Sequence, residues 1–375
     1  MNRRDWMKTA GAAGLMAAAP FGSSLFAAGV PETHGTAKIE PHIVRLNLRH
    51  TWTTTMSAST YRDTIHLRYT RDGITGYGEG APIVRYQEDA ASAKTAIESV
   101  ARLLTSADPL CFEKLMALVC QQVKGEYAGK AAIDIAVMDW AGKKLDLPIY
   151  RFLGLDPADT PLTTFSIGID TPEITKQKTR EAKAFPVLKI KVGLDSDEQT
   201  IAAVRSVTDK PLRVDANEGW KDREVAVRKI EWLAKQGVEL IEQPMAADRL
   251  DDLHWIKERI SIPMFGDESC QRAGDIPKLV GVFDGVNIKL DKAGGIMEAY
   301  RMIQMAKALG FKTMLGCMVS SSCSVTAAAH LSPLVDYADL DGNLLIANDP
   351  FVGVTVKQGK LVLPKGPGLG IRPRT

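Results

Sequence analysis

Alternating apolar and polar positions dominate the first part of the chain. Residues 39–48 and 64–70 alternate with a period of two, which is typical of half-buried β-strands. Asp72-Gly73 follows the second segment and predicts a hairpin turn, with a return strand through Gly76-Tyr77-Gly78-Glu79. The stretch 50–60 is polar and rich in Thr and Ser, and it predicts a loop between the first two strands.

Helical spacing then replaces the alternation. Apolar residues recur at helical intervals over 87–104, 115–123 and, most regularly, 130–145, where Leu147-Pro148 predicts the end of the last helix. A sheet followed by helices predicts an α+β unit over residues 37–155.

Repeated strand-and-helix units are predicted for the second part of the chain. Apolar strand candidates recur roughly every 25 residues, each followed by a helical pattern. The eight candidates are 164–169, 187–192, 212–217, 240–244, 263–269, 285–290, 313–318 and 337–341. Eight such units predict a parallel α/β barrel over residues 160–345. A doubly wound sheet is the alternative, but no GxGxxG follows the first strand. Residues 346–375, with a hairpin signal at 357–360, are expected to close the chain.

Composition restricts the class of partner. The 375 residues are 45% hydrophobic and 25% charged, as in globular proteins with a large core. A formal net charge of +2 without any run of Lys or Arg argues against nucleic acid as a partner. The five cysteines form no CxxC pair, so neither a zinc cluster nor a disulfide framework is expected.

The first 28 residues have the features of an export signal. The pair Arg3-Arg4 is followed by a mildly apolar segment, 9–19, and then by the small residues Ala27-Ala28. This order predicts a twin-arginine-type signal over residues 1–28 and a periplasmic or exported protein. No later apolar run is long enough for a membrane span, so no membrane contact is expected after signal removal. An N-terminal amphipathic helix is the alternative.

Two lysines interrupt the apolar strand 187–192. Leu188 and Ile190 share one face of this strand, and Lys189 and Lys191 share the other. Buried charge is costly unless it is paired, so the lysine face is expected to point at anionic groups. An edge strand with a solvated lysine face is the alternative.

Polar residues also stand at the carboxyl ends of the later strands, where a barrel carries its chemistry. In chain order these ends hold Lys189 and Lys191, Asp215 and Asn217, Glu242, Asp267, Lys289 and Asp291, and Asp339 and Asp341. Asp215, Glu242 and Asp267 come from three successive strands, and three carboxylates with room for water and substrate suit Mg²⁺. Zinc would favour His or Cys, and no His falls at a strand end. Separate capping or salt-bridge roles for the three acids are the alternative.

Lys191 and Lys289 are expected on opposite sides of this metal site, because four βα units separate them. Two bases that face each other across a metal-bound carboxylate are what a 1,1-proton transfer requires. One base removes the α-proton, and the other returns a proton from the opposite face. The positive charges of Lys189 and Mg²⁺ disfavour the ammonium form of a lysine beside them. Such a lysine is therefore expected to be a free amine near neutral pH. Simple pairing of these lysines with the carboxylates is the alternative.

Taken in order, these residues resemble the enolase superfamily, and within it the muconate-lactonizing subgroup. The resemblance is carried by Lys189-Ile190-Lys191, by Val214-Asp215-Ala216-Asn217, by Ile241-Glu242-Gln243-Pro244, by Gly266-Asp267-Glu268-Ser269 and by residues 287–295. Residues 76–79, 131–154 and 366–370 extend it over nearly all of the chain after the signal. It implies an α/β fold with a modified TIM barrel, (β/α)7β, and an N-terminal α+β capping domain to which residues 346–375 return.

The last strand is similar to that of dipeptide epimerases. Ala338-Asp339-Leu340-Asp341-Gly342 resembles their Asp-x-Asp, in which two carboxylates hold the α-ammonium of the substrate. Two acids on one strand face suit a cation and would repel a dicarboxylate. A solvated pair of acids is the alternative. The resemblance also implies that Asn217, Cys317 and Met318 lie beside a bound dipeptide.

Two positions depart from the pattern. Met56 stands near the place where L-Ala-D/L-Glu epimerases have an arginine for the substrate Glu carboxylate, which favours an apolar or uncharged second residue. Ser320 stands where many relatives have Glu, so the details at the seventh strand stay open.

The resemblance implies a Mg²⁺-dependent dipeptide epimerase that inverts the α-carbon of the C-terminal residue through an enediolate. Lys191 and Lys289 would be the acid/base residues, with Lys189 assisting Lys191 and the substrate carboxylate. The rival interpretations are an N-acylamino acid racemase or cycloisomerase with the same site, and a non-catalytic periplasmic peptide-binding protein. Peptidoglycan-derived and dietary peptides are both plausible sources of substrate, and a homo-oligomer is left open.

Overall fold

The computed structural model describes residues 37–375, so the signal expected over residues 1–28 lies outside the described part. The chain begins with a three-stranded antiparallel sheet in the order β1 (Lys38–Thr53), β2 (Ala58–Arg71) and β3 (Ile74–Gly80). Four helices follow: α1 (Ala90–Ser99), α2 (Ala101–Ser106), α3 (Phe112–Gln122) and α4 (Tyr127–Lys144). Asp72-Gly73 forms the turn between β2 and β3, as the sequence predicts, and both residues have positive φ angles.

The core of this cap lies between the sheet and α4. Ile65, Leu67 and Tyr69 alternate along β2 and are buried in one cluster with residues of α4 such as Ala136 and Trp140. β3 approaches α4 so closely that a Cβ on Gly78 would lie 1.9 Å from the carbonyl oxygen of Ala132. The glycines of β3 therefore permit a backbone contact that any side chain would prevent.

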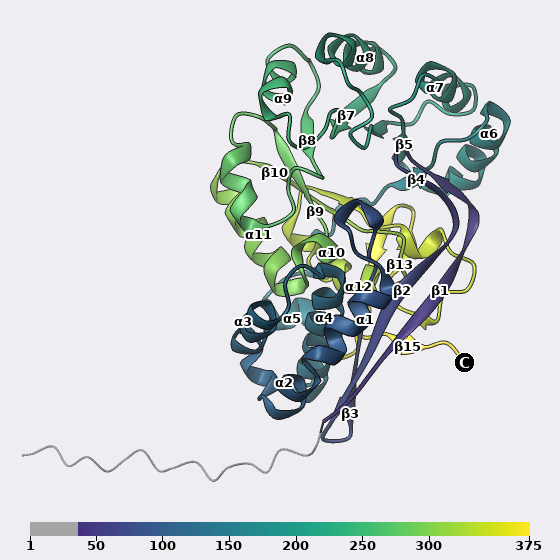
Figure 1. Cartoon of the computed structure of the whole chain (residues 1–375). Helices are drawn as coiled ribbons and strands as arrows, with labels where there is room; N and C mark the ends of the chain where they lie inside the picture. Colours follow the sequence, from purple (N-terminus) through teal and green to yellow (C-terminus); the bar gives the residue numbers. More distant parts are fainter. Residues whose placement is uncertain (1–36) are drawn as a thin grey trace, which may run out of the picture. The chain divides into compact units, whose positions relative to one another are not determined.

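The polar stretch 50–60, expected to be a loop, is mostly strand. β1 continues to Thr53 and β2 starts at Ala58, with Trp52 paired to Ser59, so only residues 54–57 turn. Thr and Trp favour extended backbone, and a register shift between Asn47 and Trp52 lets the pairing resume. The tip of this long hairpin reaches the barrel, where the N–H of Ile169 donates to the carbonyl of Thr53 at 3.0 Å (Figure 1).

The second part of the chain confirms the eight predicted parallel strands. They are β4 (Phe165–Ile167), β5 (Leu188–Lys191), β6 (Leu212–Asp215), β7 (Val238–Glu242), β8 (Met264–Gly266), β9 (Gly285–Ile288), β10 (Lys312–Gly316) and β11 (Tyr337–Asp339). Each strand pairs with the next in parallel, and a bridge between Thr163 and Ala338 joins the two end strands. The sheet is therefore a nearly closed barrel.

Helices cover the outside of this barrel (Figure 1). They are α6 (Pro172–Glu181), α7 (Asp197–Arg205), α8 (Arg223–Lys235), α9 (Leu250–Lys257), α11 (Ile296–Ala308) and α12 (Ser322–Ala329). The short α10 (Leu290–Ala293) follows β9 and packs against α4 of the cap. The connection after β8 carries the 3₁₀ helix η6 (Ala273–Leu279), which contains Pro277, in place of an α-helix. Pro277 lacks the N–H that an α-helix would use there, and no helix is needed after β11. This arrangement agrees with (β/α)7β.

The chain's last residues return to the cap, as expected. After the short α5 (Ile149–Phe152) and the barrel come β12 (Phe351–Val352), β13 (Thr355–Lys357), β14 (Lys360–Val362) and β15 (Arg372–Pro373). Lys357 pairs with Lys360 in the predicted hairpin. The N–H of Leu369 donates to Asp139 of α4 at 2.7 Å, and that of Ile149 donates to the carbonyl of Gly368 at 3.0 Å. These bonds attach the C-terminal segment to the cap.

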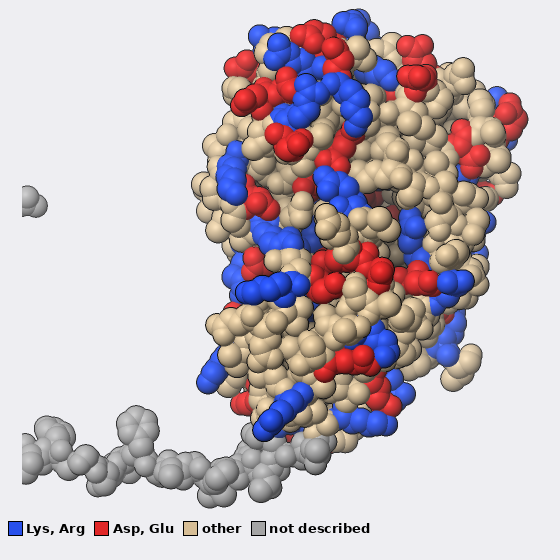
Figure 2. Space-filling view, in the orientation of Figure 1, with Lys and Arg blue, Asp and Glu red and all other residues tan. Residues whose placement is uncertain are grey.

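The surface and the helices carry two further facts. Figure 2 shows a band of acidic residues across the middle of the visible face, with basic residues on both sides of it. None of the helices that residues 37–375 form has the length and apolar character needed to cross a membrane.

Candidate active site

A cavity of about 750 Å³ lies between the cap hairpin and the carboxyl ends of the barrel strands. The cap contributes side chains from β1, β2 and the segment after β3, among them Trp52, Met56, Arg62, Arg85 and Tyr86. The barrel contributes Ser166, Lys189, Lys191, Asn217, Asp267, Glu268, Lys289, Cys317, Met318, Asp339 and Asp341. Thr55 at the hairpin tip donates to the carbonyl of Asn217 at 2.7 Å, so cap and barrel are joined at the cavity wall.

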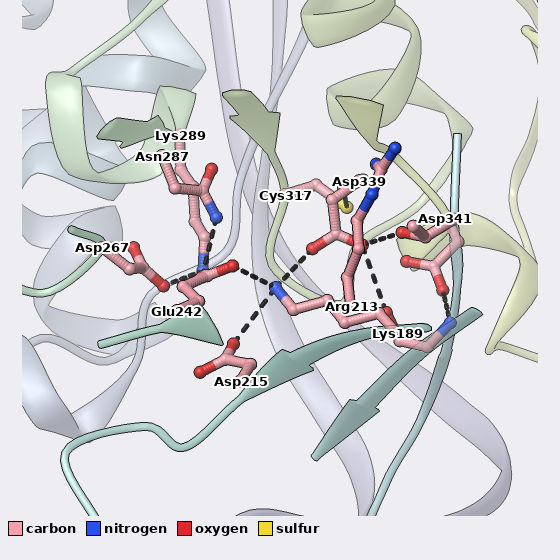
Figure 3. Close-up of polar contacts among 12 residues, drawn as sticks. Lys189, Arg213, Asp215, Glu242, Asp267, Asn287, Lys289, Cys317, Asp339 and Asp341 are labelled. Atoms are coloured by element: carbon pink, nitrogen blue, oxygen red, sulfur yellow. Dashed lines mark hydrogen bonds and ion pairs between the residues drawn. The ribbon is translucent and has the colours of Figure 1, made fainter. Parts of the chain in front are cut away.

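Asp215, Glu242 and Asp267 converge beneath this cavity, as the sequence predicts (Figure 3). Asp215 ends β6, Glu242 ends β7 in register with it, and Asp267 follows β8 directly. All three are buried, and each offers an oxygen within 4.8 Å of those of the other two. Three clustered carboxylates without His or Cys are a donor set for a hard cation such as Mg²⁺. The residues present therefore fit magnesium.

The two lysines of β5 point into the barrel, because Leu188 and Ile190 occupy the face packed on the helices. Lys191 donates to Asp215 at 2.6 Å. Lys189 donates to Glu242 at 2.9 Å and to Asp339 at 2.6 Å. The expected anionic partners of this strand are therefore the carboxylates at the ends of other strands, and the edge-strand alternative is wrong.

Lys289 reaches the same carboxylates from the other side of the barrel. It follows β9, which is four places from β5 in the strand order, and its Nζ donates to Asp267 at 2.7 Å. Lys292 also holds Asp267: its fully buried ammonium donates to the backbone carbonyls of Asp267 and Asn287 at 2.6 and 2.9 Å. Lys191 and Lys289 thus contact different members of one carboxylate cluster.

Burial and neighbouring charge set the electrostatics of the cluster. Burial, followed by the negative charge of Asp215, raises the pKa of Glu242 to about 8. Burial opposes the ammonium form of Lys289, but the charge of Asp267 outweighs it and raises the pKa of Lys289 above its usual value. Burial likewise opposes the charge on Lys189, and Asp339 and Glu242 outweigh it, so its pKa is raised as well. Both directions favour the ammonium form, because carboxylates surround the two lysines.

Asp339 and Asp341 lie at the far wall of the cavity, on and after β11. Asp339 accepts hydrogen bonds from Lys189 and from the Ser166 hydroxyl, the latter at 3.3 Å. Asp341 accepts the backbone N–H of Ser166. Burial, and then the charge of Asp339, raise the pKa of Asp341 to about 7. Both carboxylates line the cavity, so they are not a solvated pair on a loop.

The other residues singled out in the sequence differ in whether they line the cavity. Asn217, Cys317 and Met318 line the cavity, and Met56 lines it from the hairpin turn with 41% of its surface exposed. Ser320 is fully buried and donates to the carbonyl of Met318 at 3.2 Å, so it shapes the loop behind the cavity wall.

Sequence reasoning missed four residues near the site. Asn287 donates to Glu242 at 2.9 Å, and the parity that picked out Lys289 on the same strand would have indicated it. Glu268 is buried at the cavity, with one carboxylate oxygen that has no partner among the described residues. Lys292 could have been indicated by its position three residues after Lys289. No local signal marks Arg62, which lies on β2 between the predicted loop 50–60 and the predicted strand 64–70.

Comparison with known protein families agrees with this geometry. The model described as "Mandelate racemase / muconate lactonizing enzyme, N-terminal domain" matches residues 38–154, and the model "Enolase C-terminal domain-like" matches residues 174–375. The chain belongs to the enolase superfamily. The two models cover the cap and the barrel from α6 onward, and magnesium with a Lys or His base is general in enolase-superfamily sites.

Several relatives within the enolase superfamily are similar over nearly their whole length. An L-Ala-D/L-Glu epimerase of Bacteroides thetaiotaomicron is 42% identical, covering 99% of this chain and 99% of that protein. An L-Ala-D/L-amino acid epimerase of Pedosphaera parvula is 43% identical, covering 88% of this chain and 97% of that protein. The solved dipeptide epimerase of Cytophaga hutchinsonii, complexed with Mg and D-Ala-L-Val, has a TM-score of 0.86 and is 27% identical. It covers 90% of this chain and 96% of its own.

Proposed function

We propose that this protein is a Mg²⁺-dependent dipeptide epimerase that inverts the α-carbon of the C-terminal residue by 1,1-proton transfer. One observation carries the proposal: Lys191 and Lys289 approach a single carboxylate cluster from strands four places apart in an eight-stranded barrel. Binding alone does not need two basic side chains on opposite sides of one point, whereas inversion of a carbon does. The names of the similar relatives support the same reaction class.

The metal site in this proposal consists of Asp215, Glu242 and Asp267. Magnesium bound there would stabilise the negative charge that develops on the substrate carboxylate and lower the pKa of the neighbouring lysines. Lys189, which lies between Glu242 and Asp339, would hold the same substrate carboxylate through its ammonium.

Lys191 and Lys289 carry the proton. The lysine on one side accepts the α-proton as a neutral amine and becomes an ammonium, which leaves the substrate as an enediolate. The ammonium on the other side donates its own proton to the opposite face of the carbon and becomes an amine. One proton leaves and one arrives, so the inverted product has the same composition as the substrate. The reverse direction exchanges the two roles.

Asp339 and Asp341 would bind the α-ammonium of the dipeptide. Their carboxylates line the cavity beyond Lys189, where the N-terminal end of a substrate held at the metal would lie. A free ammonium distinguishes a dipeptide from an N-acylamino acid, so these acids favour epimerisation over the racemase and cycloisomerase alternatives.

Two finer points belong to the same proposal. Met56 lines the cavity from the hairpin turn, which supports an apolar or uncharged second residue in the dipeptide. Residues 1–28 have the features of a twin-arginine-type signal, and these features support export, so that the substrates would be peptides outside the cytoplasm.

The test is α-proton exchange in D₂O, followed by ¹H NMR on a panel of dipeptides and N-acylamino acids with Mg²⁺ present. We expect deuterium at the α-carbon of the second residue of at least one dipeptide, together with formation of the other stereoisomer. Exchange only with N-acylamino acids would favour the racemase, and no exchange with any member of the panel would favour a binding protein.

A further inference from the structure

Each carboxylate of the metal site has one oxygen that accepts a hydrogen bond from a group other than the lysines of the cavity. The pairs are Asp215 Oδ1 with the backbone N–H of Asn217 at 2.9 Å, Glu242 Oε1 with the side-chain amide of Asn287 at 2.9 Å, and Asp267 Oδ1 with the ammonium of Lys292 (Figure 3 shows Asn287 beside Glu242). We call these three atoms the outer oxygens.

The second oxygen of each acid, which we call the inner oxygen, accepts an ammonium that lines the cavity. The pairs are Asp215 Oδ2 with Lys191 at 2.6 Å, Glu242 Oε2 with Lys189 at 2.9 Å, and Asp267 Oδ2 with Lys289 at 2.7 Å. The ammonium of Lys189 also lies 3.1 Å from the inner oxygen of Asp215, so the inner oxygens of Asp215 and Glu242 share one cation. The inner oxygens therefore face the cations of the cavity.

Asn287 is fixed inside the barrel beside Glu242. It lies on β9, is fully buried and does not line the cavity. An ionised carboxylate only accepts hydrogen bonds, so the amide must present its NH₂ group to Glu242. The amide oxygen has no partner among residues 37–375, and Gly316 of β10 leaves room for it, because a Cβ on Gly316 would lie 2.6 Å away. The bond to Glu242 therefore orients this side chain.

Lys292 holds Asp267 through an ammonium that is buried away from the cavity. Its side chain is 1% exposed and does not line the cavity. Besides the outer oxygen of Asp267, the ammonium donates to the backbone carbonyls of Asp267, Cys270 and Asn287 at 2.6, 2.9 and 2.9 Å. These carbonyls belong to the loop after β8 and to β9, so backbone groups fix the position of the ammonium. The proposed proton transfer does not use this lysine, and its contacts leave it a role in holding Asp267.

Divalent cations differ in how they use a carboxylate. Ca²⁺ takes about six to eight oxygen ligands and readily binds both oxygens of one carboxylate, whereas Mg²⁺ requires a near-octahedral set of ligands and keeps several waters. An outer oxygen that is bonded to a buried amide or ammonium would have to lose that bond before it could bind an ion. The cluster thus offers one oxygen from each acid, which suits Mg²⁺ better than Ca²⁺.

We propose that Asn287 and Lys292 determine the metal specificity of this site: they hold the outer oxygens of Glu242 and Asp267, so that each acid binds the ion through one oxygen and Mg²⁺ is favoured over Ca²⁺. This inference rests on the metal site of the proposed function, but not on the dipeptide or on the proton transfer. Both side chains are positioning residues, since they act on the ion through its ligands.

Isothermal titration calorimetry measures the Kd of Mg²⁺ and the Kd of Ca²⁺ separately, on the intact protein freed of divalent ions and without any dipeptide. The readout is the ratio of the Kd for Ca²⁺ to the Kd for Mg²⁺. Both ions carry the same charge, so a change in the net charge of the site affects both alike and leaves the ratio unchanged. We expect the wild-type protein to bind Mg²⁺ more tightly than Ca²⁺.

Variants assign this preference to the two side chains. In Asn287→Leu and in Lys292→Met the ratio should fall about 10-fold, since loss of a group that orients a metal ligand changes metal affinity by about 10- to 100-fold. Lys178→Met is the matched control. It removes a buried ammonium that pairs with Asp170 at 2.9 Å, outside the carboxylate cluster, and it should keep the wild-type ratio.

The outcomes separate this inference from the proposed function. Wild-type protein that binds Ca²⁺ at least as tightly as Mg²⁺ would overturn the inference, and this result does not depend on the folding of any variant. An unchanged ratio in folded Asn287→Leu or Lys292→Met would overturn the role of that side chain. No binding of either ion to the wild type would overturn the metal site and, with it, the inference. Because α-proton exchange is not the readout, a failure of the epimerase function alone would leave this test intact.

Discussion

Lys189 lies 2.6 Å from Asp339, so a single ammonium joins the last barrel strand to the carboxylate cluster. The same ammonium contacts Glu242 at 2.9 Å and Asp215 at 3.1 Å. Neutralising Asp339 would therefore remove one ionic partner of Lys189. Because Lys189 also contacts Glu242 and Asp215, the same change would disturb the metal ligands. Asp341 has no ion pair with Lys189 in the described residues, and it is the cleaner probe of ammonium binding.

Replacement of either facing lysine should stop epimerisation. Lys191→Ala and Lys289→Ala each remove one of the two groups that move the proton, and loss of general acid–base catalysis lowers kcat by about 10²- to 10⁴-fold. Each variant should still exchange the α-proton of the one stereoisomer that faces its remaining lysine. ¹H NMR in D₂O with separate L,L and L,D dipeptides measures this asymmetry, with circular dichroism as the check on folding. Full activity in both variants would exclude the two-base scheme.

The affinity for dipeptides should weaken in acid because of Asp341. Its pKa of about 7 means that its carboxyl is protonated below neutral pH, and a neutral carboxyl binds an ammonium less well. KM for a dipeptide should therefore rise as the pH falls from 8 to 5.5, approaching about tenfold per pH unit below the pKa.

The folded-state pKa of Asp341 is raised, so the folded protein binds this proton more tightly than the unfolded chain. The free energy of unfolding should accordingly decrease as the pH rises from about 4 to about 7.

The control for this pH dependence is Asp341→Asn, which cannot ionise. Its KM should be raised about tenfold at pH 8 and should depend less on pH, because the titrating group has been removed. An N-acylamino acid has no ammonium, so any turnover of it should respond little to the same substitution. A wild-type KM that stays constant between pH 5.5 and 8 would exclude this role for Asp341.

Removal of divalent cations should abolish activity and lower thermal stability. Chelation followed by dialysis leaves three buried carboxylates close together, and added Mg²⁺ should restore turnover. At a concentration one hundred times its Kd, the ion should add about 2.7 kcal/mol to the free energy of unfolding. Differential scanning calorimetry with and without Mg²⁺ measures this gain, which Asp215→Asn should largely lose. A fully active chelated protein with an unchanged melting temperature would contradict the metal site.

The contact between β3 and α4 should tolerate no side chain. In Gly78→Ala the new methyl would lie 1.9 Å from the carbonyl oxygen of Ala132, so strand and helix must separate. We expect a loss of about 1–3 kcal/mol in the free energy of unfolding, measured by urea denaturation. Gly274→Ala is the control, since its methyl would meet nothing within 4 Å, and it should change stability by less than about 0.5 kcal/mol. Equal losses in the two variants would mean that the contact is not close-packed.

Much of the fold followed from local patterns in the chain. A period of two placed Lys189 and Lys191 on the side of β5 opposite to Leu188, and regular βα spacing placed eight strands in one barrel. Once the strands were in order, the carboxyl-end rule alone brought Asp215, Glu242 and Asp267 together. These features depend on short-range periodicity and on a rule shared by all parallel barrels, so they could be read from the sequence.

Other features depend on contacts between segments far apart in the chain, and no local pattern encodes them. The β1–β2 hairpin extends through a polar stretch because its tip is held by Ile169 and Asn217, more than a hundred residues away. That extension is what brings Arg62 to the wall of the cavity. The raised pKa of Lys289 likewise arises from the negative charge of Asp267 beside it, which outweighs the burial of its ammonium, since electrostatic interactions depend on distance and desolvation in the folded chain.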